Sequence, residues 1–143
     1  MPITYRIDYE RRIVLARGYG IFTDEDAFNY QREVWSGKDI SGFNELIDMT
    51  HVSEIAAPST QRIQDLASVA ALMDLVSAPS RFAIVAPSDR TYALARAYRA
   101  YRDREPRSTK DVGVFRTLAE AFAYLGIKDA PALPEPPPTV AGP

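Results

Sequence analysis

The first twenty residues of the chain contain two apolar, β-branched runs that are separated by a short charged gap. Residues 3–9 are rich in Ile, Thr and Tyr, the triplet 10–12 is charged, and residues 13–19 resume the apolar pattern. Two such runs with a short polar gap are typical of a β-hairpin. Gly18 and Gly20 mark the expected exit from its second strand.

Three short apolar runs farther along the chain predict further strands. These runs cover residues 43–50, 81–87 and 111–116. After the first of them, a loop is expected from His51 to Pro58.

Helical spacing of apolar residues fills the intervals between and after these strands. Thr23, Ser88 and Thr117 stand where N-terminal capping side chains are expected, and Asp26 follows Thr23 at capping-box spacing. Gly126 is placed to end the last helix. The predicted helices cover residues 23–36, 59–76, 88–103 and 117–125.

The resulting order, β-β-α-β-α-β-α-β-α, predicts an α/β fold. Strands that alternate with helices form right-handed crossovers and parallel pairs, and the hairpin makes the first strand antiparallel to the second. We therefore expect a mixed five-stranded sheet with helices packed against it, formed by a single domain over residues 1–127. Six of the eleven prolines lie in residues 128–143, which predicts a flexible Pro-rich C-terminal tail.

The helix predicted for residues 59–76 has an apolar arc wider than one sheet face needs. A second contact surface, such as a subunit interface, would cover the excess. The alternative is burial under the chain's own tail or loops. On the first interpretation, we expect a homodimer, whose interface candidates are Val69, Leu72, Leu75 and Val76.

Charge and length limit the classes of partner. The chain has 143 residues, with 17 Lys and Arg against 19 Asp and Glu. This slightly acidic balance does not favour nucleic-acid binding, which needs a basic field. The most apolar stretch, residues 67–78, is interrupted by Asp74 and is too short for a membrane span. The first residues lack the pattern of a secretory signal, so we expect a cytoplasmic protein that binds neither nucleic acid nor membranes.

The composition also removes several chemistries. The chain has no Cys and one His, which excludes disulfides, thiol nucleophiles and multi-histidine metal sites within one chain. His51 lies near Asp48 and Ser53, but alternation along a strand sends neighbours to opposite faces, which disfavours a catalytic triad. We therefore expect no metal, no cofactor and no catalytic residues.

The most site-like segment is the loop at residues 87–92. Ligands of open α/β sheets bind beyond the carboxyl ends of the strands, and this loop leads into a helix N-terminus, which favours anions. The candidate ligand-binding residues at this edge are Ser59, Thr60, Ser88, Asp89, Arg90 and Thr91. The competing interpretation is simple helix capping by Ser88 or Asp89, with Arg90 in solvent.

Two stretches resemble the STAS domain of anti-sigma-factor antagonists, which has the SpoIIAA-like fold. In residues 46–55, a strand reaches Asp48, an apolar residue and Thr50, and then continues with Val52 and Ile55. The second stretch combines residues 81–85 with residues 112–121, where a strand ending in Val-Phe precedes a Glu-Ala helix. The resemblance extends over residues 3–127 and implies the SpoIIAA-like fold.

One departure bears on function. Where the STAS family has Asp-Ser, with the Ser as phosphorylation switch, this sequence has Ala56 and Ala57. Ser59 and Thr60 lie just downstream and would substitute only in a remodelled loop. The resemblance is therefore closer to uncharacterised SpoIIAA-like proteins that lack the phosphorylatable serine in register.

Three functional hypotheses follow. The first is a non-catalytic interaction or regulatory module that forms a homodimer and binds a protein partner. The alternative is a domain that binds a small molecule or lipid through the carboxyl-end loops, because lipid-transfer domains of the Sec14 type are similar in fold. An enzyme that uses the same loops is the third.

Overall fold

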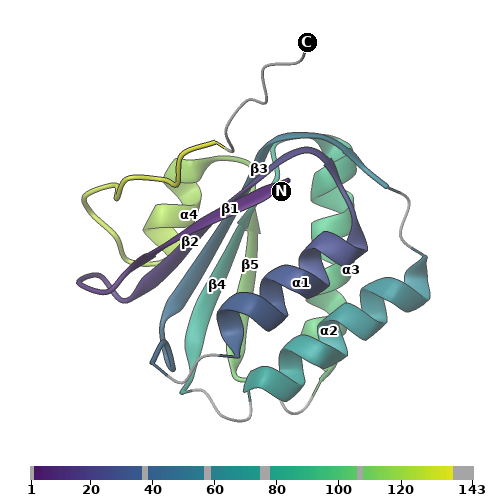
Figure 1. Ribbon diagram of the computed structural model, residues 1–143, viewed down its shortest axis with the longest axis horizontal. Helices are drawn as coiled ribbons and strands as arrows, with labels where there is room; N and C mark the ends of the chain where they lie inside the picture. The colour runs from purple at the N-terminus through teal and green to yellow at the C-terminus, as the bar shows by residue number, and fades with distance from the viewer. Residues whose placement is uncertain (1, 37–38, 57–58, 75–77, 106–107, 137–143) are drawn as a thin grey trace.

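A twisted five-stranded sheet forms the centre of the molecule in the computed structural model, which describes residues 2–36, 39–56, 59–74, 78–105 and 108–136 (Figure 1). The strands are β1 (Ile3–Asp8), β2 (Ile13–Phe22), β3 (Asn44–Ile55), β4 (Ser80–Val85) and β5 (Lys110–Phe115). They lie in the spatial order β1-β2-β3-β4-β5. β1 pairs with β2 antiparallel, and the other neighbours pair in parallel.

Four helices cover the two faces of this sheet unequally. The helices are α1 (Asp24–Trp35), α2 (Thr60–Asp74), α3 (Asp89–Arg104) and α4 (Leu118–Tyr124). Figure 1 shows α1, α2 and α3 together on one face and α4 on the other. The parallel strands progress in one direction across the sheet, so right-handed crossovers bring the first three helices to the same face. The predicted α/β fold, its element order and its mixed sheet are confirmed.

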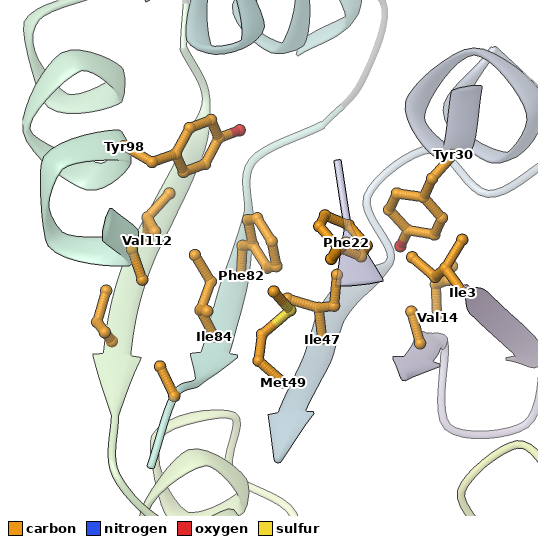
Figure 2. Packing of buried hydrophobic residues seen from close by; sticks show 14 of the residues in the cluster. Ile3, Val14, Phe22, Tyr30, Ile47, Met49, Phe82, Ile84, Tyr98 and Val112 are labelled. Carbon is orange, nitrogen blue, oxygen red and sulfur yellow. The ribbon is translucent and has the colours of Figure 1, made fainter. Parts of the chain in front are cut away.

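Alternation along the strands gives two hydrophobic cores. Ile47, Met49, Phe82, Ile84 and Val112 point toward the first three helices, and Figure 2 shows them close together there. The intervening positions face α4, and they include Leu15, Leu46, Ala83 and Val85. Because both faces of the central strands are covered, these strands are apolar at almost every position.

The loop expected from His51 to Pro58 is wrong from His51 to Ile55, because β3 continues to Ile55, and its residues 57 and 58 lie outside the described part of the chain. β2 also continues beyond Gly20 to Phe22, so the two strands stay paired through two register shifts. Gly18 is inside this pairing and does not mark an exit. A Cβ at Gly18 would lie 2.8 Å from Val52 Cγ2, so a larger residue at position 18 would have to displace the Val52 side chain. Pairing between the two backbones thus extends a strand whose own side-chain pattern is weak.

The predicted helix caps are present. The Thr23 hydroxyl accepts from the Asp26 backbone amide, and the Asp26 carboxylate accepts from the Thr23 amide, which completes a capping box. The Ser88 and Thr117 hydroxyls cap α3 and α4 by accepting from the backbone amides of Thr91 and Glu120. Gly126 follows α4 with a φ of 73°, the left-handed conformation that favours glycine.

Part of the segment predicted as a tail contacts the sheet. Leu133 packs against the core on the α4 face, and Arg6 Nη1 donates a hydrogen bond to the Ala132 carbonyl oxygen at 3.0 Å. Figure 1 shows this segment passing along the β1 side of the sheet. Residues 137–143 lie outside the described part of the chain.

The apolar arc of α2 is covered only in part. Leu72 is 49% exposed and Val69 is half-buried, whereas Leu75 and Val76 lie outside the described residues. Within the described segments, the structure contains no helix with the length and apolar character that a membrane crossing requires.

Candidate ligand-binding cavity

A cavity of about 140 Å³ lies between the sheet and the three helices α1, α2 and α3. Its floor consists of side chains from β2, β3 and β4, namely Phe22, Ile47, Met49, Ile55, Phe82 and Ile84. Its helical walls are Ala27, Ile63, Leu66, Leu94 and Ala95, with Tyr30 and Tyr98 beside them. Figure 2 shows Phe82, Ile84 and Met49 rising from their strands toward the region between Tyr98 and Tyr30.

Small residues in the helical walls help to explain why this space exists. Ala27 on α1 and Ala95 on α3 both line the cavity. A larger side chain at either position would extend into the cavity, and the alanine methyl group does not fill it. The floor residues belong to strands whose opposite face packs against α4 and the second hydrophobic core. The helices therefore cannot close the space without displacing the sheet from its second core.

Beside the cavity lies a hydrogen-bonded group of four side chains, Tyr30, Trp35, Glu45 and Lys110, of which Tyr30 and Glu45 line the cavity. Glu45 Oε1 accepts from Lys110 Nζ at 2.8 Å. Glu45 Oε2 accepts from the Tyr30 hydroxyl at 2.6 Å and from Trp35 Nε1 at 2.9 Å. Burial, and then the adjacent Glu45 carboxylate, raise the pKa of Tyr30 well above its usual value. Both oxygens of the carboxylate are therefore occupied, and Tyr30 stays protonated as a donor at neutral pH.

A second polar contact lies on the α1–α3 side of the cavity. Tyr98 is 8% exposed, and its hydroxyl accepts from Arg102 Nη1 at 2.6 Å. Gln31 Nε2 on α1 also donates to this hydroxyl, at 3.5 Å. The other amide atom, Gln31 Oε1, is shielded from solvent and has no hydrogen-bond partner. An unsatisfied acceptor thus belongs to a residue of the cavity wall.

At the carboxyl edge of the parallel strands, the first turns of α1 and α2 border the cavity. Asp24 and Arg62 line the cavity there, and Arg62 Nε donates to Asp24 Oδ2 at 2.6 Å. This hydrogen bond holds the pKa of the Asp24 carboxyl below its usual value. The Arg62 guanidinium also lies 4.7 Å from the centre of the Phe28 ring. An ion pair therefore borders the cavity at this edge, whereas most of the other lining residues are apolar.

The structure separates the six predicted ligand-binding residues. Thr91 is buried and lines the cavity. Ser88 is the N-cap of α3, Asp89 binds Arg116 at 2.8 Å, and Arg90 is exposed. In the α2 loop, Ser59 accepts from the Arg62 backbone amide. Thr60 is exposed in the first turn of α2. All six lie near the carboxyl edge, and Thr91 alone among them belongs to the cavity wall.

His51 and Asp48, which were considered as members of a catalytic triad, contact different partners. His51 stacks on Tyr19 with ring centres 5.7 Å apart. Asp48 is buried, accepts from Thr50 and lies 3.3 Å from Arg17 Nε. Nothing in these contacts brings His51 and Asp48 together as a base and its orienting acid.

The sequence analysis missed Glu45, Lys110, Tyr30, Gln31 and Tyr98. A signal was present for two of them. Glu45 precedes Ile47 and Met49 at strand spacing, and Lys110 stands in the same relation to Val112 and Val114. A charged residue in phase with the buried face of a strand indicates a paired internal charge. Gln31 has no comparable local signal, because its partner Tyr98 comes from another helix.

No family model matches this sequence, and no curated protein matches it. Among solved structures, the chain is similar to an uncharacterised protein from Shewanella loihica PV-4, which is described as a DUF3478-family protein with a SpoIIAA-like fold. The match has a TM-score of 0.55 and 16% sequence identity, and covers 86% of this chain and 93% of the other. The chain therefore has a SpoIIAA-like fold, as its resemblance to STAS domains implied. The lack of a phosphorylatable serine stays a prediction, since Ala57 is outside the described residues.

Proposed function

We propose that this protein binds a small apolar molecule in the cavity between its sheet and helices α1–α3. The observation that carries the proposal is the apolar space of about 140 Å³. Protein interiors are close-packed, so an apolar space of this size between a sheet and its helices needs an explanation. A ligand that fills it removes its apolar walls from water, which is favourable.

The walls support a site that exists before the ligand arrives. Ile47, Phe82 and Ile84 belong to paired strands, whose other face is covered by the α4 core. A rigid, preformed pocket avoids the entropic cost of ordering loops on binding. The size also limits the ligand, because an apolar cavity of about 150 Å³ holds benzene or xenon. We therefore expect a small ring or a short chain.

The opening supports access from the carboxyl edge of the sheet, where open α/β sheets bind their ligands. Asp24 and Arg62 are partly exposed there, and their ion pair links α1 to α2. Separation of the two side chains widens the entrance without breaking a backbone hydrogen bond. The ligand then passes between the helix ends and reaches the apolar floor.

The test is calorimetric titration of the protein with octanol and toluene. Ala95→Leu fills the cavity from α3, and Ala100→Leu adds the same atoms at an exposed position of the same helix. We expect the wild-type protein and Ala100→Leu to bind both probes with the same affinity. Ala95→Leu should lose binding while remaining folded. Equal binding by the two variants would place the ligand elsewhere, and no binding by the wild-type protein would reject the proposal.

A second candidate function is a protein-interaction module that dimerises through α2. It is supported by Leu72, a large apolar residue that is 49% exposed. Light scattering after size-exclusion chromatography tests it by comparing the wild-type protein with Leu72→Gln. A dimer that becomes a monomer in the variant supports this function, and a wild-type monomer at high concentration rejects it.

A further inference from the structure

Aromatic side chains from four elements line the cavity: Phe22 of β2, Phe82 of β4, Tyr30 of α1 and Tyr98 of α3. We propose that the ligand is a single uncharged aromatic ring, which these side chains recognise through ring contacts. The inference rests on the proposed function, since it names the class of ligand for the same cavity. It separates an aromatic ring from a saturated ring or a short chain, which the volume alone does not separate.

The surface of the cavity limits what the ligand can carry. Almost all of this surface belongs to apolar atoms. The hydroxyl groups of the two tyrosines are held by protein partners, because Tyr30 donates to Glu45 at 2.6 Å and Tyr98 accepts from Arg102 at 2.6 Å. What the tyrosines contribute to the cavity surface is therefore carbon. A polar group on the ligand would lose its hydrogen bonds to water and would find little to replace them.

A charged group on the ligand is disfavoured as well, because the charged side chains that border the cavity are paired. Glu45 is bound to Lys110 at 2.8 Å, and Asp24 is bound to Arg62 at 2.6 Å. An ionised ligand would have to break one of these pairs to gain a counter-charge. An uncharged ring needs no such exchange.

The aromatic side chains are arranged for contact with a further ring. Figure 2 shows the rings of Phe22 and Phe82 between Tyr30 and Tyr98. Phe82 and Tyr98 already form an edge-to-face pair, with ring centres 6.5 Å apart and ring planes at 75°. Such pairs gain more than the burial of their area, because the positive edge of one ring meets the negative face of the other. A ligand ring beside them extends this arrangement, whereas a saturated ring has no such charge distribution.

Conformational entropy favours a ring over a chain. A short alkyl chain loses the freedom of its rotatable bonds when it is enclosed, and a ring has none to lose. The volume of about 140 Å³ is suitable, since an apolar cavity of about 150 Å³ holds benzene. Ile47, Ile84 and Leu94 complete the wall with aliphatic surface. A single ring therefore fills the space without a polar anchor.

The test compares benzene with cyclohexane, which has the same number of carbon atoms but no aromatic charge distribution. Both are titrated calorimetrically into the wild-type protein and into Phe82→Leu, Phe22→Leu and Ile84→Leu. The first two variants each replace a ring of the cavity wall by an aliphatic side chain, and Ile84→Leu is the control that reshapes the wall without removing a ring. The quantity compared is the ratio of benzene affinity to cyclohexane affinity, because the difference in their transfer from water cancels between proteins.

We expect this ratio to fall about fivefold in each aromatic variant, within the range of one aromatic pair, and to stay unchanged in Ile84→Leu. A fall in one aromatic variant alone supports a ring contact on that side of the cavity. A wild-type measurement that needs no variant is the isotope-filtered NMR spectrum with benzene, which should show contacts to the ring protons of Phe82 and Tyr98. Absence of these contacts would overturn the inference.

The remaining outcomes separate this inference from the proposed function. If both compounds bind and the ratio is unchanged in the two aromatic variants, or falls equally in Ile84→Leu, the cavity is a ligand site and the assignment of an aromatic ring is wrong. Binding of cyclohexane without binding of benzene rejects the assignment as well. If neither compound binds the wild-type protein, the proposed function itself fails.

Discussion

Glu45 and Lys110 form an ion pair of 2.8 Å although the strands that carry them are separated by β4. Both side chains are almost completely buried, and the Lys110 ammonium lies 3.1 Å from the centre of the Trp35 ring. The pair reaches over Phe82, whose ring is a floor of the cavity. It therefore ties β3 to β5 beneath the helices, beside the apolar space that Glu45 lines.

Removal of one partner of this pair should destabilise the fold strongly. Lys110→Met leaves the Glu45 carboxylate buried without its cation, and breaking a buried pair in this way costs about 3–5 kcal/mol. Urea unfolding measures the loss of free energy. The double variant Glu45→Gln/Lys110→Met removes both charges and should lose less than Lys110→Met alone. A double variant as unstable as Lys110→Met would mean that the loss comes from packing and not from the unpaired charge.

Tyr30 should make the protein sensitive to alkaline pH. Its folded pKa is raised well above the usual 10.0 by burial and by the Glu45 carboxylate. The stability that this shift contributes is fully present below pH 10 and is lost as the pH rises toward the folded pKa. Tyr30→Phe should therefore lose less unfolding free energy than the wild-type protein above pH 10. Urea unfolding at each pH measures this difference. If the unfolding free energies of the two proteins fall equally above pH 10, the raised pKa of Tyr30 is contradicted.

The ion pair at the entrance should respond to acid. Arg62 holds the pKa of Asp24 below its usual 3.8 by a direct hydrogen bond. The stabilisation is present above pH 3.8 and is lost as the pH falls through the lowered folded pKa. We expect the difference in unfolding free energy between the wild-type protein and Asp24→Asn to be constant near neutral pH and to shrink below pH 3.8. A difference that does not change with pH would show that the pair contributes nothing through its charge.

Leu133 should contribute to stability although it lies after the last helix. Its side chain is half-buried against the core on the α4 face. Leu133→Ala should cost about 1–2 kcal/mol, roughly half of the loss for a fully buried leucine. Glu135→Ala, at an exposed position two residues later, is the matched control and should cost nothing measurable. Equal unfolding midpoints for the two variants would mean that the segment does not hold the core.

The fold could be predicted further from the sequence than the site could. The order of elements and the caps at Thr23, Ser88 and Thr117 depend on local spacing, which one sequence displays directly. The continuation of β3 to Ile55 depends on β2, and Gly18 has its role only because Val52 lies against it. Such a contact between strands leaves no local signature.

The cavity is even harder to predict from one sequence, because it depends on residues from several elements. Its helical walls include Ala27 of α1 and Ala95 of α3. Each alanine alone is ordinary in a helix, and only their convergence leaves space. The loop at residues 87–92 was predicted from the general location of ligand sites in α/β sheets. That principle leads to Thr91, which lines the cavity, but it does not lead to Gln31, Glu45 or Tyr98, which line it as well.

The central claim is that a small apolar molecule occupies the cavity. The most direct measurement is an isotope-filtered NMR experiment that records contacts between unlabelled octanol and the labelled protein. The account predicts contacts from octanol to the methyl groups of Ile47, Ile84 and Leu94, which line the cavity from the sheet and from α3. Contacts to the exposed methyl groups of Leu72 without contacts to these three residues would contradict it.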